Sequence, residues 1–130
     1  MKTIFRIEDA KTGIGMYHSG KAQFFMNEGD YDNHPAPSRD SLLVQNINVF
    51  KKRDGYASAS DFKYGFDSIK QMRRWLYEDR WLKQLDTNGL KLAEIDVDES
   101  NLIVGHTQVM FRNEVSKRHY KINEYFNQDK

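Results

Sequence analysis

The stretch that decides the fold is Tyr64–Phe111, with the sequence YGFDSIKQMRRWLYEDRWLKQLDTNGLKLAEIDVDESNLIVGHTQVMF. Ser68 followed by Gln71 has the spacing of a capping box, in which each side chain satisfies a free backbone N–H at a helix start. Apolar residues then recur at helical spacing, and Asn88-Gly89 is typical of a helix end, because glycine adopts the left-handed conformation without a Cβ clash. The pattern therefore predicts helical structure from Ser68 to Asn88, either as one bent helix or as two helices separated at Glu78-Asp79.

Strands follow this helical part. Leu90–Val97 alternates apolar and polar residues, which is typical of a half-buried strand. Leu102–Val104 and Thr107–Arg112 are also strand-like, and Thr3–Ile7 adds a strand near the start of the chain. We therefore predict an α+β fold in which a mixed or antiparallel sheet carries two or three packed helices, with residues 1–130 as a single globular domain.

The remaining segments are less regular. Residues 27–41 are predicted to form a long loop, because Pro35 and Pro37 block regular structure and push the residues before them into extended conformations. Loops of this length in compact domains are often functional. Leu42–Phe50 fits either a helix or a strand, and the tail at 127–130 is predicted to fray.

Composition limits the class of protein. The 130 residues carry 20 Lys and Arg against 19 Asp and Glu, so the net charge of +1 gives no overall attraction to nucleic acid or to an anionic membrane. An aromatic content of 13% argues against a disordered chain. The absence of Cys excludes disulfides and thiolate zinc sites in this sequence. With no signal-peptide pattern and no long apolar run, we expect a cytoplasmic protein with no membrane partner, in the host cytoplasm if a phage encodes it.

The chain resembles small uncharacterised proteins of phages and bacteria. The motifs that carry this resemblance are the opening Phe5-Arg6-Ile7-Glu8, the Gly-x-Gly-x-Tyr turn at Gly13–Tyr17, the His-Pro-x-Pro loop at His34–Pro37, and the Gly-Phe-x-Ser helix start at Gly65–Ser68. This resemblance covers most of the chain and implies membership of a phage-related group, but it implies no known activity.

The order of elements also resembles the ADP-ribosyltransferase superfamily. That resemblance implies that Arg6 is the early basic residue that holds NAD, Ser68 the central serine before a helix, and Gln108 the residue at the catalytic Glu position. A glutamine lacks the carboxylate that stabilises positive charge on the ribose during transfer. The resemblance therefore implies binding of NAD, an ADP-ribose-like ligand or another nucleotide, with little or no transferase activity.

Two further residues are candidates for the ligand site. Tyr17 and His18 follow a glycine turn, where an aromatic ring can stack on a base and an imidazole can carry a proton. Each candidate also has a structural interpretation: Tyr17 as a loop anchor, Arg6 as a solvated edge charge, Ser68 as a helix cap, and Gln108 as an outward strand residue. The four histidines lack metal-ligand spacing, so we predict no metal site.

Two other functions stay open beside nucleotide binding. The first is a protein-interaction module that inhibits a host protein through an aromatic surface, which predicts a large exposed apolar patch. The second is nucleic-acid binding by the basic side of the helices, where Arg73-Arg74, Arg80 and Lys83 interleave with Trp75, Tyr77 and Trp81. The tail is also basic, with Arg112, Lys117, Arg118 and Lys121. The sequence predicts neither the oligomeric state nor the identity of a host partner.

Overall fold

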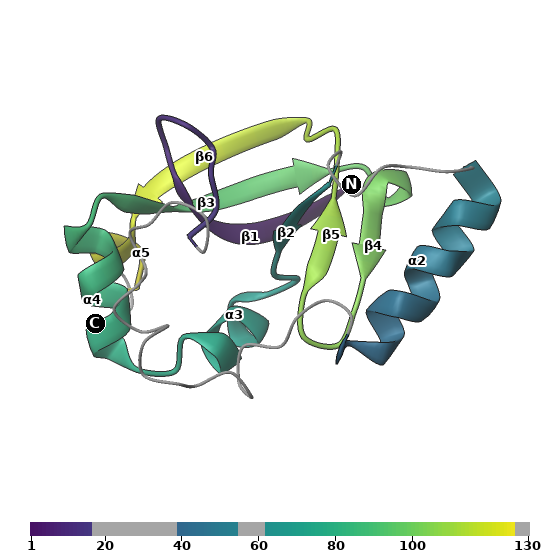
Figure 1. Cartoon of the computed structure of the whole chain (residues 1–130). Coiled ribbons are helices and arrows are strands. Elements are labelled where there is room, and N and C mark those ends of the chain that lie inside the picture. Colours follow the sequence, from purple (N-terminus) through teal and green to yellow (C-terminus); the bar gives the residue numbers. More distant parts are fainter. Residues whose placement is uncertain (17–38, 55–61, 127–130) are drawn as a thin grey trace.

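The computed structural model describes residues 1–16, 39–54 and 62–126. It confirms the α+β class, with two small antiparallel sheets and helices packed against them (Figure 1). The predicted loop at 27–38, the Tyr17 and His18 candidates, and the tail at 127–130 lie outside the described residues. No helix within the described ranges is long and apolar enough to cross a membrane.

The first sheet, called sheet A, contains the two long strands. β1 (Lys2–Asp9) pairs with β3 (Leu90–Val97), which pairs in turn with β6 (Ser116–Lys121), and both pairings are antiparallel. The strands predicted at 3–7 and 90–97 are therefore present, and the first extends by one or two residues at each end. β3 is the central strand of sheet A, and it has buried residues on both of its faces.

The second sheet, called sheet B, is built from three short strands. β5 (Val109–Phe111) lies between β2 (Lys63–Gly65) and β4 (Leu102–Val104), again with antiparallel pairing. Phe5 and Phe66 join the two sheets, because each backbone N–H donates to the other residue's carbonyl at 2.8 and 2.7 Å. The chain thus forms a continuous series of neighbouring strands in which β1 lies beside β2.

Gly65 lies at this junction and leaves no room for a side chain. A Cβ atom there would lie 2.8 Å from the carbonyl oxygen of Phe5. We expect Gly65→Ala to lower the free energy of unfolding by about 1–3 kcal/mol, because the backbones of β1 and β2 would have to separate. Urea denaturation followed by circular dichroism would measure the change, and an unaltered midpoint would show that the junction tolerates separation.

The helical part divides into two helices, which settles the alternative left open by the sequence. α3 (Ile69–Trp75) and α4 (Asp79–Thr87) are separated at Leu76–Glu78. Ser68 caps α3, because its Oγ accepts from the backbone N–H of Gln71 at 3.0 Å. The end of α4 is also as predicted, since Gly89 has a φ of 88°.

These helices cover one face of sheet A. A large apolar cluster joins α3 and α4 to the sheet and to α5 (Ile122–Phe126). Its fully buried members include Trp81, Leu85 and Leu92. The opposite face of sheet A packs partly against sheet B through Ile4, Ile95 and Phe111. The last described part of the chain, β6 and α5, packs on this core.

α2 (Ser41–Asp54) resolves the ambiguous 42–50 segment as a helix. Figure 1 shows it at the end of the molecule beside β4, away from α4 and α5. The helix packs through Leu43 and Phe50 against Ile103 and Met110 of sheet B. The predicted loop ended at residue 41, whereas Ser41 already belongs to the helix.

Candidate functional site

A fully buried carboxylate is the main feature of sheet A outside the apolar core. The Glu8 side chain has no exposed surface. Its Oε1 accepts from Nε of Arg6 at 3.1 Å, and its Oε2 accepts from Nζ of Lys117 at 3.0 Å. Nε2 of His119 lies 3.1 Å from the same Oε2. We call Arg6, Glu8, Lys117 and His119 the Glu8 cluster.

Strand periodicity places these side chains on one face. Arg6 and Glu8 are two residues apart on β1, and Lys117 and His119 are two residues apart on β6, so each pair shares a face. Ala93 of β3 lies between the two strands, in register with Arg6 and with His119. Its small side chain leaves space for the longer ones to meet above it.

The charge of Glu8 is stabilised despite its burial. Burial alone would raise the pKa of this carboxyl, but hydrogen bonds from Lys117 and His119 and the positive charges of Lys117 and Arg6 outweigh it, so the pKa is lowered. Burial lowers the pKa of Arg6, and the nearby Glu8 opposes that change. Glu8 is therefore an ionised group at neutral pH, held between cations.

Arg6 also contacts the backbone of β2 and of the loop that follows β1. Its guanidinium donates to the carbonyls of Tyr64 at 2.6 Å and Gly13 at 3.2 Å. A Cβ at Gly15 would lie 2.9 Å from the same guanidinium, so the chain at 10–15 returns closely over it. Only 11% of the Arg6 side chain is exposed, which shows that the interpretation as a solvated edge charge is wrong.

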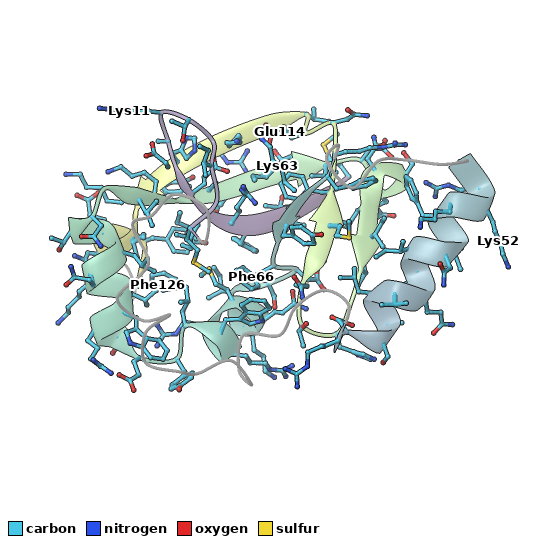
Figure 2. All side chains as sticks on the ribbon, in the orientation of Figure 1. Lys11, Lys52, Lys63, Phe66, Glu114 and Phe126 are labelled. Atoms are coloured by element: carbon cyan, nitrogen blue, oxygen red, sulfur yellow. The ribbon has the colours of Figure 1, made fainter. Side chains whose placement is uncertain are left out.

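More cations surround the cluster. Nζ of Lys63 on β2 lies 3.8 Å from Oε1 of Glu114 (Figure 2). Nζ of Lys117 lies 3.4 Å from the same oxygen. Lys91 of β3 and Lys121 of β6 are in register with each other, and Lys91 is in register with Glu8. The cluster and its surroundings thus hold five lysine and arginine side chains against two carboxylates, before any proton on His119 is counted.

Ser68 and Gln108 lie at a different place, around the turn between β4 and β5. Gln71 links the start of α3 to the β4–β5 turn. Its side chain accepts from the N–H of Asp67 at 2.7 Å and donates to the carbonyl of His106 at 3.1 Å. The Ser68 hydroxyl acts as the helix cap. Gln108 precedes β5 and its side chain is buried, so its interpretation as an outward strand residue is wrong.

Asp40 holds the same turn from the side of α2. Its carboxylate is almost fully buried and accepts from the backbone N–H groups of Leu43, His106 and Thr107 at 2.8–3.0 Å, and from the Thr107 hydroxyl at 2.8 Å. The indole N–H of Trp75 donates to the Thr107 carbonyl at 2.9 Å. These polar groups are used in fixing the turn, so the turn acts as a structural joint.

The three residues of the ADP-ribosyltransferase resemblance lie on or next to three different strands. Arg6 is on β1, Ser68 follows neighbouring β2, and Gln108 precedes β5, the next strand. Their side chains, however, make separate sets of contacts, and only Arg6 belongs to the Glu8 cluster.

The sequence reasoning missed Glu8 and His119 as site residues, and it included Lys117 only as part of the basic tail. The available signal was the i, i+2 spacing of charged residues on two strands. Within the described parts of the chain, no group of three or more His, Asp or Glu side chains is arranged to hold a metal ion.

Comparison with known proteins identifies a phage family. The family model described as "Bacteriophage T4 Y00F protein" matches residues 1–124. A protein of Enterobacteria phage T4, "Uncharacterized 19.7 kDa protein in motB-dexA intergenic region", is 30% identical over 105 residues, which are 71% of this chain. The chain spans 62% of that relative's length. No solved structure matches. The chain therefore belongs to the Bacteriophage T4 Y00F protein family, which confirms the resemblance to small uncharacterised phage proteins.

Proposed function

We propose that this member of the phage Y00F family binds an anionic ligand of the nucleotide class at the Glu8 cluster, without transferring a group from it. The observation that carries the proposal is the buried Glu8 carboxylate held by Arg6, Lys117 and His119. NAD and ADP-ribose are the first ligands to consider. The protein would act in this way inside the infected host cell.

The cluster is a costly arrangement for a purely structural purpose. Removing a carboxylate and its cations from water has a desolvation penalty that their attraction offsets only with good geometry, and an apolar replacement is often equally stable. Perturbed ionisable groups of this kind are concentrated at functional sites. Here Glu8 keeps its charge under complete burial, which fixes the positions of Lys117 and His119 at the surface of sheet A.

The charge balance favours an anion as the ligand. Glu8 and Glu114 leave the surrounding lysines only partly neutralised, so the local field is positive although the whole chain is nearly neutral. His119 is 30% exposed and uses Nε2 toward Glu8, which leaves its second ring nitrogen for a ligand. A phosphate meets these requirements, since cationic donors make charge-assisted hydrogen bonds to its oxygens.

Binding without transfer is the form of activity that the residues support. The only carboxylate inside the cluster is Glu8, and both of its oxygens are already engaged with cations. Gln108, which the resemblance assigns to the position of the transferase Glu, carries no charge. A developing positive charge on a ribose would therefore find no free carboxylate among these residues.

A thermal-shift screen tests this function directly. We expect NAD or ADP-ribose at 100 times its dissociation constant to stabilise the protein by about 2.7 kcal/mol, and adenosine, which lacks phosphate, to have a much smaller effect. Cyclic dinucleotides extend the same comparison to other nucleotide ligands. His119→Gln keeps a polar side chain but removes the imidazole ring beside Glu8, so it should reduce the shift.

A control separates loss of binding from loss of folding. His106→Gln changes an exposed histidine on the β4–β5 turn, whose backbone and not its ring makes the contacts to Asp40 and Gln71. This variant should retain the full ligand-induced shift. No stabilisation of the wild-type protein by any of these nucleotides would refute the proposal and favour the protein-interaction alternative.

A further inference from the structure

Two lysines face each other beside the Glu8 cluster. Lys91 of β3 and Lys121 of β6 are register partners, and both lie on the face that carries Arg6, Glu8 and His119. Neither lysine side chain makes a hydrogen bond or an ion pair within the described ranges 1–16, 39–54 and 62–126. Like charges directly opposite each other destabilise a sheet, so this pair is unfavourable when nothing lies between it.

The other charges around the pair do not relieve it. Glu8 is in register with Lys91, but its oxygens are already occupied by Arg6, Lys117 and His119. Glu114 approaches Lys63 and Lys117. Among the described residues, the in-register lysines therefore remain two positive charges without a counterion, next to a site that is itself positive.

From this arrangement we infer that the ligand carries a diphosphate, with one phosphate at His119 and the other between Lys91 and Lys121. The inference rests on the proposed function and specifies its ligand class. Consecutive residues on one face of a strand are about 6.6–6.8 Å apart, so His119 and Lys121 present their side chains at neighbouring positions along β6. A single phosphate at His119 would leave the lysine pair uncompensated, whereas the second phosphate of a diphosphate would neutralise it.

This inference predicts a dependence on the number of phosphates. Inorganic pyrophosphate should bind more tightly than inorganic phosphate, and ADP-ribose more tightly than AMP. The difference should decrease as salt is added, because exposed charges are screened over about 10 Å at 0.1 M ionic strength. Isothermal titration calorimetry of the full chain with these four compounds measures both effects.

Two variants and one control test the lysine pair. We expect Lys91→Gln and Lys121→Gln each to weaken ADP-ribose binding by about five- to tenfold, since each removes one close charge pair with a phosphate. Each should also slightly raise the midpoint of thermal unfolding without ligand, because the repulsion between the lysines disappears. Lys83→Gln on α4, another exposed lysine outside sheet A, should change neither quantity.

The outcomes separate the two proposals. Wild-type affinity for ADP-ribose in both lysine variants, together with loss of binding in His119→Gln, would overturn the diphosphate inference and leave the proposed function standing. No binding of any of the four compounds to the wild-type protein would overturn both. Tighter binding of a single-stranded oligonucleotide than of ADP-ribose would also overturn the inference, because it would indicate a nucleic-acid surface.

Discussion

Replacing Glu8 with glutamine is expected to lower the free energy of unfolding by about 3 kcal/mol, the loss typical of breaking a buried ion pair from one side. The amide cannot neutralise Arg6 and Lys117, whose side chains are only 11% and 18% exposed. Its NH₂ group would also face N–H donors. Chemical denaturation at neutral pH measures the loss, and Glu99→Gln, an exposed change on the turn before β4, should stay within about 0.5 kcal/mol of wild type.

A double-mutant cycle identifies the cause of this loss. The cause could be the positive charges that glutamine leaves without a counterion. In that case Lys117→Met should lower the free energy of unfolding by less in the Glu8→Gln background than in the wild-type protein. Equal costs in the two backgrounds would mean that the charge pair contributes nothing, and that the glutamine acts through packing alone.

Glu8 should also make the stability of the protein decrease in acid. The folded-state pKa of Glu8 is lowered below its ordinary value of 4.5, so its contribution is fully present above that pH and is lost as the pH falls through the folded-state pKa. Wild-type stability should therefore fall more steeply below about pH 4.5 than that of Glu8→Gln. Parallel pH profiles of the two proteins would contradict this assignment.

Elements that depend on local interactions were predicted from the sequence, whereas contacts between residues far apart in the chain were not. The helices after Ser68 and the strand at 90–97 depend on periodicity and caps within one segment, and the structure confirms them. The Glu8 cluster depends on β6 returning beside β3, so that Lys117 and His119 reach a residue 109 and 111 positions earlier. No local pattern contains that pairing.

The β4–β5 turn shows the same limit at a shorter range. The alternation of apolar residues predicted a strand from Thr107, but the strand begins at Val109. Asp40, far away in sequence, binds the N–H groups of His106 and Thr107 and thereby keeps them out of a strand ladder. Tertiary contacts of this kind override local strand preference. The same contacts bury Gln108, which the alternation had placed on an outward face.

Asp40→Ala is therefore expected to have the second large effect, a loss of about 3 kcal/mol or more. The substitution removes the side-chain cap of α2, typically about 1 kcal/mol, and leaves the buried N–H groups of His106 and Thr107 without partners, at about 1–3 kcal/mol each. Asp98→Ala is the matched control, because Asp98 likewise accepts from a nearby backbone N–H, that of Ser100, but lies exposed. It should cost much less.

Hydrogen exchange shows whether this loss is local. α2 contacts the rest of the described structure mainly through sheet B. Loss of the Asp40 hydrogen bonds should therefore let the amides of 41–54 and of the β4–β5 turn exchange before those of β1 and β3. Burial raises the pKa of the Asp40 carboxyl, but hydrogen bonds from Thr107, His106 and Leu43 outweigh it and leave the pKa lowered. Acid should accordingly open the same amides in the wild-type protein as the pH falls below the ordinary Asp range. Uniform loss of protection across both sheets in Asp40→Ala would instead mean that α2 and sheet A unfold as one cooperative unit.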